Sequence, residues 1–175
     1  MRCFLLVCTL LLSPLTLAGT VLENSLWRVE IDPATLALRV TPLGETSVQA
    51  SSGIPAHTVS DVQGNAEQAS WQWDGGAYRL VARLEQRDLT LTVTARDPGE
   101  LALLNQPAEA IGQGVIWPLA EGHYVPAGNA VWKAFLLEQG AINTTQDLSL
   151  PLWGVDHGTF TLNWLLTNPY NNRLR

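Results

Sequence analysis

Several stretches of this chain alternate apolar and polar residues with a period of two. In the first of them, Trp27, Val29 and Ile31 fall on one side and charged residues fall on the other. The same alternation recurs in three further stretches, at residues 36–41, 78–84 and 89–94. A period of two places successive side chains on opposite faces of a β-strand. Each stretch is therefore predicted to be a strand with one buried face.

Short turn motifs separate these strands. Pro33-Ala34-Thr35 lies between the first two, which predicts an opening hairpin. Asp74-Gly75-Gly76 follows Trp71-Gln72-Trp73, and glycine accepts the positive φ angles that a tight hairpin turn needs. A third turn at Asp97-Pro98-Gly99 extends the pattern, so residues 70–104 are predicted to form an antiparallel meander.

The rest of the chain adds one helix and more strands. Residues 129–138 are the only segment with helical character, and Asn129 suits the N-cap of that helix. Residues 148–153 and 159–166 are predicted to be strands, whereas residues 47–69 lack the alternation and are interpreted as a looser region. Many short strands separated by turns predict an all-β fold, an antiparallel β-sandwich of the supersandwich type with one short helix.

Residues 1–18 have the features of an export signal. Arg2 supplies a positive start, residues 4–12 form a short apolar run, and small residues precede a predicted cleavage after Ala18. The apolar run is shorter than the roughly 20 residues of a membrane-spanning helix, which argues against an anchor. We predict an exported protein, periplasmic or extracellular, whose residues 19–175 form one β-sandwich domain.

Composition narrows the functional classes. Sixteen acidic residues outnumber ten basic ones, and binding to nucleic acid needs a basic stripe that the scattered arginines do not supply. Cys3 and Cys8 both lie in the signal, so the mature chain is predicted to lack disulfides and thiolate ligands. The three histidines, His57, His123 and His157, are too far apart for a standard zinc spacing. No metal, no cofactor and no catalytic nucleophile is predicted.

The candidate binding residues lie in two stretches bracketed by proline and glycine, residues 117–126 and 150–158. Both are interpreted as rigid loops that carry aromatic rings, carboxylates and imidazoles toward solvent. A sugar presents C–H patches on its ring faces and hydroxyls around its edge, which suits such a combination. The predicted carbohydrate-binding residues are Glu121, His123, Tyr124, Trp153, Asp156 and His157. In the alternative interpretation, the aromatic rings pack against the sandwich and only their polar tips reach water.

Seven tryptophans occur in the chain, and most are predicted to pack in the core. Trp71 and Trp73, for example, share one face of a predicted strand. The three exceptions, which are candidate stacking platforms, are Trp117, Trp132 and Trp153.

Four segments occur in a characteristic order: residues 26–32, then Glu121-Gly122-His123-Tyr124-Val125-Pro126, then residues 148–154 and 166–172. In this order they resemble the N-terminal β-sandwich of large secreted bacterial glycoside hydrolases. In those enzymes a galactose-mutarotase-like supersandwich precedes a (β/α)-barrel that carries the catalytic carboxylates. The histidine and glutamate motif of the sugar epimerase is absent here, so mutarotase activity is not implied.

The resemblance implies a non-catalytic accessory domain, truncated at its C-terminal end. Its partners would be a carbohydrate or glycoconjugate and a catalytic barrel that follows Arg175. Two alternatives stay open: a stand-alone carbohydrate-binding module, and a structural exported β-sandwich whose tryptophans only pack. Glycan binding by the domain separates the first of these from the second.

Overall fold

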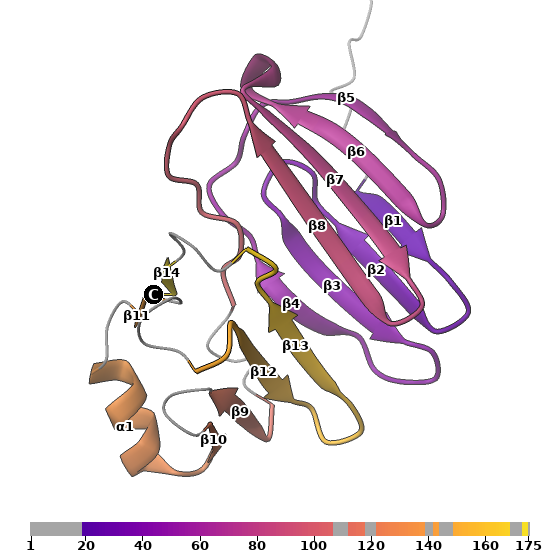
Figure 1. Ribbon diagram of the computed structural model, residues 1–175. Helices are drawn as coiled ribbons and strands as arrows, with labels where there is room; N and C mark the ends of the chain where they lie inside the picture. Colours follow the sequence, from indigo (N-terminus) through magenta and orange to yellow (C-terminus); the bar gives the residue numbers. More distant parts are fainter. Residues whose placement is uncertain are drawn as a thin grey trace, which may run out of the picture.

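A computed structural model describes residues 19–106, 112–117, 122–138, 142–143, 149–168 and 173–174. The predicted signal, residues 1–18, and the predicted binding residue Glu121 lie outside this part of the chain. The described residues form antiparallel sheets with one α-helix and one 3-10 turn (Figure 1). The predicted all-β antiparallel sandwich with one short helix is confirmed.

Two four-stranded sheets stack face to face to form the main sandwich (Figure 1). The first has the order β1(Thr20–Glu23), β2(Trp27–Ile31), β3(Ala37–Pro42), β4(Val48–Ser52). The second has the order β5(Val59–Gly64), β6(Gln68–Trp73), β7(Tyr78–Glu85), β8(Asp88–Ala95), and the 3-10 turn η1(Asp74–Gly76) joins β6 to β7. Each strand pairs with its neighbour in sequence, so both the opening hairpin and the hairpin between β6 and β7 are confirmed.

The core lies between these two sheets. Along β7, Leu80, Ala82 and Leu84 are buried, whereas Arg79 and Arg83 between them are exposed. The remaining buried hydrophobic residues of this core are Leu22, Val29, Ile31, Leu36, Leu38, Val40, Ala50, Ala69, Trp71 and Trp73. Burial of these apolar side chains is the main favourable contribution to folding, because residues 19–175 contain no cysteine that could form a disulfide.

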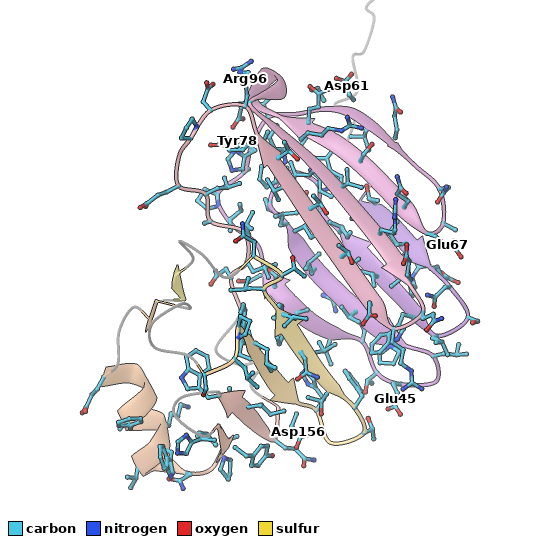
Figure 2. All side chains as sticks on the ribbon, in the orientation of Figure 1. Glu45, Asp61, Glu67, Tyr78, Arg96 and Asp156 are labelled. Carbon is cyan, nitrogen blue, oxygen red and sulfur yellow. The ribbon has the colours of Figure 1, made fainter. Side chains whose placement is uncertain are left out.

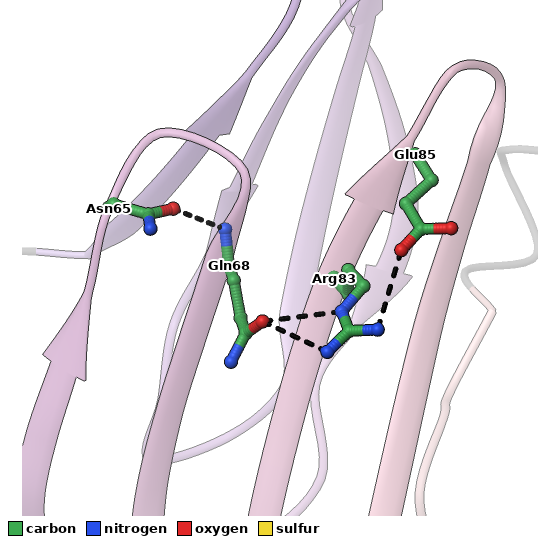
Figure 3. A network of polar contacts seen from close by, with 4 residues as sticks. All are labelled: Asn65, Gln68, Arg83 and Glu85. Carbon is green, nitrogen blue, oxygen red and sulfur yellow. Dashed lines mark hydrogen bonds and ion pairs between the residues drawn. The ribbon is translucent and has the colours of Figure 1, made fainter.

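The outward face of the second sheet is polar. Gln68 Oε1 accepts bonds from Arg83 Nε at 3.2 Å and Nη2 at 3.1 Å, and Arg83 Nη1 reaches Glu85 at 3.4 Å (Figure 3). The backbone N–H of Gln68 donates in turn to Asn65 Oδ1. These contacts lie on the outward face, while alternate residues of β6 and β7 are buried on the inward face, which accounts for the alternation in sequence.

A third sheet lies beside the main sandwich (Figure 1). Its order is β10(His123–Pro126), β9(Gly114–Trp117), β12(Leu152–Asp156), β13(Thr161–Leu165). Leu162 and Trp164 of β13 pack against the core of the main sandwich and join the two parts. The helix α1(Ala130–Glu138) follows β10, and β11(Ile142–Asn143) pairs with β14(Arg173–Leu174). Asn129 caps the helix as predicted, since its Oδ1 accepts from the Trp132 N–H at 3.1 Å.

Several segments differ from the sequence-based expectation. Residues 47–69, interpreted as loose, contain both β4 and β5. The side chains of β5 are almost all exposed, so an edge strand formed by pairing with β6 has no apolar alternation to reveal it. Residues 101–104, expected to continue the meander, are not a strand, although Leu101, Leu103 and Leu104 pack against the core. The strand expected from residue 148 begins at Leu152.

At one end of the main sandwich, Asp74 of η1 forms hydrogen bonds with His57 and Thr58, which precede β5. Asp74 Oδ2 lies 2.7 Å from His57 Nδ1, and Asp74 Oδ1 accepts from the Thr58 N–H at 3.1 Å. The His57 ring stacks on Trp73 with centroids 4.2 Å apart. The hydrogen bond from His57 is the largest cause that lowers the pKa of Asp74 below its ordinary value of 3.8, and the bond from Thr58 adds to it.

We expect the Asp74 carboxylate to make stability depend on pH. Because the pKa is lower in the folded state, the stabilisation is present above pH 3.8 and is lost as the pH falls through the folded-state pKa. The wild type should therefore be more stable than Asp74→Asn at pH 7 in urea unfolding, and the difference should shrink toward pH 2. Asn tolerates the positive φ of this position, so the backbone is not an added variable.

The matched control is Asp97→Asn. Asp97 also contacts a cation, with Arg96 Nε at 3.3 Å from its Oδ2, but this ion pair is exposed on both sides. Exposed pairs contribute little to stability. The control should show no pH-dependent difference, and an Asp74→Asn difference equally large at pH 2 and pH 7 would contradict the assignment.

Candidate functional site

The described parts of the two stretches that carry the predicted binding residues are largely strands rather than loops. His123 and Tyr124 begin β10, Trp153 and Asp156 belong to β12, and only His157 follows the end of a strand. The loop interpretation is therefore wrong for these four residues, whereas the strand predicted at residues 148–153 is confirmed at Trp153. Neither strand shows the alternation that marks the main sandwich, because each combines glycine, proline and polar residues with apolar ones.

Strand pairing divides the predicted residues between the two faces of the third sheet. Tyr124 lies opposite Ile116, and Ile116 lies opposite Gly154. Residues directly opposite in an antiparallel sheet share a face, and a face recurs at every second residue. Tyr124 and Asp156 therefore share one face, which we call the tyrosine face: Gly114, Ile116, Tyr124, Pro126, Leu152, Gly154, Asp156, Thr161, Asn163 and Leu165. The opposite face, which we call the tryptophan face, carries Trp117, His123, Trp153 and Trp164.

Tyr124 and Asp156 are in direct contact on the tyrosine face. The Tyr124 hydroxyl donates to Asp156 Oδ2 at 2.8 Å, although the two residues are 32 positions apart. The backbone N–H of Gly158 donates to Asp156 Oδ1, also at 2.8 Å. Figure 2 shows Asp156 in the third sheet, far from Tyr78 and Arg96 at the opposite end of the main sandwich. Both carboxylate oxygens are thus held in place, one by a side chain and one by a tight turn.

The two hydrogen bonds to Asp156 keep the tyrosine face negatively charged. The Gly158 N–H is the largest cause that lowers the pKa of Asp156, followed by the Tyr124 hydroxyl. The same hydrogen bond raises the pKa of Tyr124 above its ordinary value of 10.0. At neutral pH the aspartate is therefore ionised and the tyrosine retains its proton. The pair presents one negative charge and a fixed phenol ring.

Two glycines create the space for these side chains. A Cβ at Gly114 would lie 2.6 Å from Tyr124 Cζ, so the Tyr124 ring rests directly on the backbone of β9. A Cβ at Gly154 would collide with the side chain of Asn163 on the neighbouring strand. Sequence reasoning did not select Gly114, Gly154 or Asn163. The available signal was glycine inside a strand, which marks a close approach by another group.

His157 supports the turn after Asp156. Its backbone N–H donates to the Phe160 carbonyl at 2.9 Å, and its ring stacks on Phe160 with centroids 5.0 Å apart. Burial lowers the pKa of His157, with a smaller opposing effect from the charge of Asp156. Phe160 meets Trp27 of the main sandwich edge-on at 6.0 Å. His157 therefore supports the turn that holds Asp156, because both its backbone and its ring contact Phe160.

The other predicted residues belong to separate aromatic clusters. Trp153 stacks on Trp164 with centroids 5.9 Å apart and planes inclined by 3°. His123 lies 4.9 Å from the ring of Trp132, which meets Phe135 edge-on at 5.3 Å. The structure thus brings together Tyr124, Asp156 and the adjacent His157, but it places Trp153 and His123 on the opposite face.

The tyrosine face combines features that suit a polar, neutral ligand. It offers an ionised acceptor in Asp156, an amide in the exposed Asn163 and an aromatic ring in the half-exposed Tyr124. In the part of the chain that the structure describes, no group of three or more His, Cys, Asp or Glu side chains could hold a metal ion. Among the described helices, none has the length and apolar character needed to cross a membrane.

Together these observations define an all-β sandwich with an open tyrosine–aspartate pair on an additional sheet. Comparisons of the chain with protein-family models, with curated proteins and with solved structures find no match.

Proposed function

We propose that this chain is an exported, carbohydrate-contacting accessory β-sandwich of a glycoside hydrolase and is not catalytic by itself. The observation that carries the proposal is the Tyr124–Asp156 contact on the open side of the third sheet. Half of the Tyr124 surface is exposed, so its ring is free to meet a ligand while its hydroxyl stays bound to the carboxylate. An aromatic plane beside a fixed acceptor is the combination that sugar rings require.

Neighbouring residues on the same face support this function. Leu165 lies on the tyrosine face and is 65% exposed, and Ile116 between the two key strands is half-buried. These apolar patches suit the C–H faces of a sugar ring. Asn163 adds donors and an acceptor for hydroxyl groups. Such a mixed surface is typical of sites that orient a ligand through a few polar groups set among apolar ones.

The accessory role rests on the number of carboxylates. Glycoside hydrolysis usually needs two carboxyl groups, about 5 to 10 Å apart, on either side of the scissile bond. Among the described residues of the tyrosine face, Asp156 supplies one. Together with the resemblance to N-terminal sandwiches of secreted hydrolases, this supports a domain that contacts glycan while a following barrel performs the reaction.

Binding of glycans by the full chain tests the proposal. We expect the protein to bind immobilised oligosaccharides on a glycan array. In isothermal titration, Tyr124→Ala should lower the affinity for the best ligand at least about tenfold. The variant removes the ring on which the sugar stacks and the hydroxyl that holds Asp156 in place, and a tenfold loss of affinity corresponds to about 1.4 kcal/mol. Because Tyr124 is half-exposed, the variant should remain folded, which thermal unfolding checks.

Thr92→Ala is the matched control, since Thr92 is exposed on β8 in the second sheet. Its glycan affinity should equal that of the wild type. The proposal fails if no glycan is retained, or if the two variants bind the same glycan equally well.

A further inference from the structure

We infer that the tyrosine face selects an uncharged saccharide, which donates two neighbouring hydroxyl groups to the two oxygens of Asp156. Uronic acids and sulfated sugars would be rejected. This inference rests on the proposed function and names the ligand class of the same site. It follows from the acceptor geometry of Asp156, from the charge of the face and from the way the Tyr124 ring is seated.

The acceptor capacity of Asp156 is half used by the protein. Oδ2 accepts from the Tyr124 hydroxyl and Oδ1 accepts from the Gly158 N–H, both at 2.8 Å. An ionised carboxylate has about four acceptor positions, two on each oxygen. One position on each oxygen therefore remains for a ligand. Two hydroxyls on adjacent ring carbons can fill both in a bidentate manner, as the paired N–H groups of arginine do.

The charge of the tyrosine face favours a neutral ligand. Its described members include one ionised group, Asp156, and no lysine or arginine. The whole chain carries a formal charge of −6, which adds to the negative potential. A carboxylate or sulfate placed within hydrogen-bonding reach of Asp156 would be repelled without a cation beside it. Hydroxyl groups make charge-assisted bonds to the same oxygens with no such penalty.

The site is already organised for this geometry. The Tyr124 ring rests on Gly114, and its hydroxyl is directed to the carboxylate, so neither side chain has to be ordered by the ligand. Asn163 extends over Gly154 on the adjacent strand. Groups fixed in advance bind at a lower entropic cost. A sugar whose ring meets Tyr124 would place its edge hydroxyls toward Asp156.

Matched pairs of oligosaccharides test the selectivity. The probes are galactose, glucose and mannose oligomers and the corresponding uronic acid oligomers, which replace the C6 hydroxymethyl by a carboxylate. In isothermal titration with the full chain at low salt, the best neutral oligomer should bind at least about tenfold more tightly than its uronate partner. At 1 M salt this ratio should fall, because the screening length shortens to about 3 Å. Analogues that lack either of two neighbouring hydroxyls should bind at least about fivefold more weakly.

Asp156→Asn tests the residue itself. Asparagine keeps a similar shape but loses the charge. The affinity for the neutral oligomer should therefore fall about tenfold, and the affinity for the uronate should lie within about threefold of it. Asp88→Asn is the matched control, because it removes one negative charge from an exposed position on β8 in the second sheet. It should leave both the affinity and the ratio unchanged.

The outcomes separate this inference from the proposed function. Equal or tighter binding of a uronate, or an unchanged ratio in Asp156→Asn, would overturn the selectivity while glycan binding itself would still stand. Unchanged binding of analogues that lack either neighbouring hydroxyl would overturn the bidentate contact. If none of the neutral or anionic oligomers binds, the proposed function and this inference both fail.

Discussion

Trp73→Ala is expected to lower the free energy of unfolding by about 3–5 kcal/mol, the usual cost of truncating a buried tryptophan. The Trp73 side chain has 0% exposure and lies between the two sheets of the main sandwich. Its Nε1 donates to the Pro33 carbonyl at 2.6 Å, and the His57 ring stacks on its indole. The variant therefore leaves a cavity, an unpaired carbonyl and an unsupported histidine. Urea denaturation at pH 7 measures the effect.

Two further variants calibrate the Trp73 result. Trp73→Phe retains much of the ring volume and loses the N–H donor, so it should cost less than the alanine variant. Trp132→Ala removes a half-buried ring from α1, outside the main core, and should also cost less. A loss of under about 1 kcal/mol in Trp73→Ala would show that this indole does not support the core.

Gly114→Ala is expected to destabilise the third sheet by about 1–3 kcal/mol and to weaken glycan binding about as much as Tyr124→Ala does. The added Cβ would lie 2.6 Å from Tyr124 Cζ and 2.8 Å from the Val125 carbonyl oxygen. Both neighbours, the Tyr124 ring and the backbone of Val125, are rigid, so neither can move away from the added Cβ at low cost. The Tyr124 hydroxyl would be displaced from Asp156, so the affinity for glycan should fall even where the variant remains folded. Urea denaturation and isothermal titration measure the two effects.

Gly99→Ala provides the control for this substitution. A Cβ at Gly99 meets nothing within 4 Å, and its φ is not in the positive range. The variant should be neutral or slightly stabilising, since alanine restricts the unfolded chain. If Gly114→Ala keeps the stability and glycan affinity of the wild type, the position of the Tyr124 ring does not depend on this glycine.

The main sandwich was predictable because its sequence pattern and its burial coincide. Trp71 and Trp73 alternate with Gln72, and in the structure the two indoles face the core while the glutamine faces outward. The turn after them was equally readable, since Asp74 and the next two glycines all adopt positive φ. Alternation of apolar and polar residues indicates that one face of a strand is buried, so it identifies strands whose other face is exposed to solvent. It does not identify β5, which is exposed almost throughout.

The candidate site was predicted in part. The sequence singled out Tyr124 and Asp156 by residue type, but as members of one loop surface together with Trp153 and His123. In the structure, the register of β9, β10 and β12 separates these residues into opposite faces. Register depends on which residues face each other across strands distant in sequence, and a shift of one position exchanges the two faces. Local composition contains no such information.

By itself, the sequence determined the fold class, the position of the core strands, the hairpin turns and the capped helix. These features depend on local periodicity, on backbone preferences and on single capping residues. Only the tertiary structure decided that Tyr124 reaches Asp156 across 32 residues, with its ring resting on a glycine of the strand between them. That contact depends on the pairing of three strands, and pairing is a property of the folded sheet rather than of any segment within it.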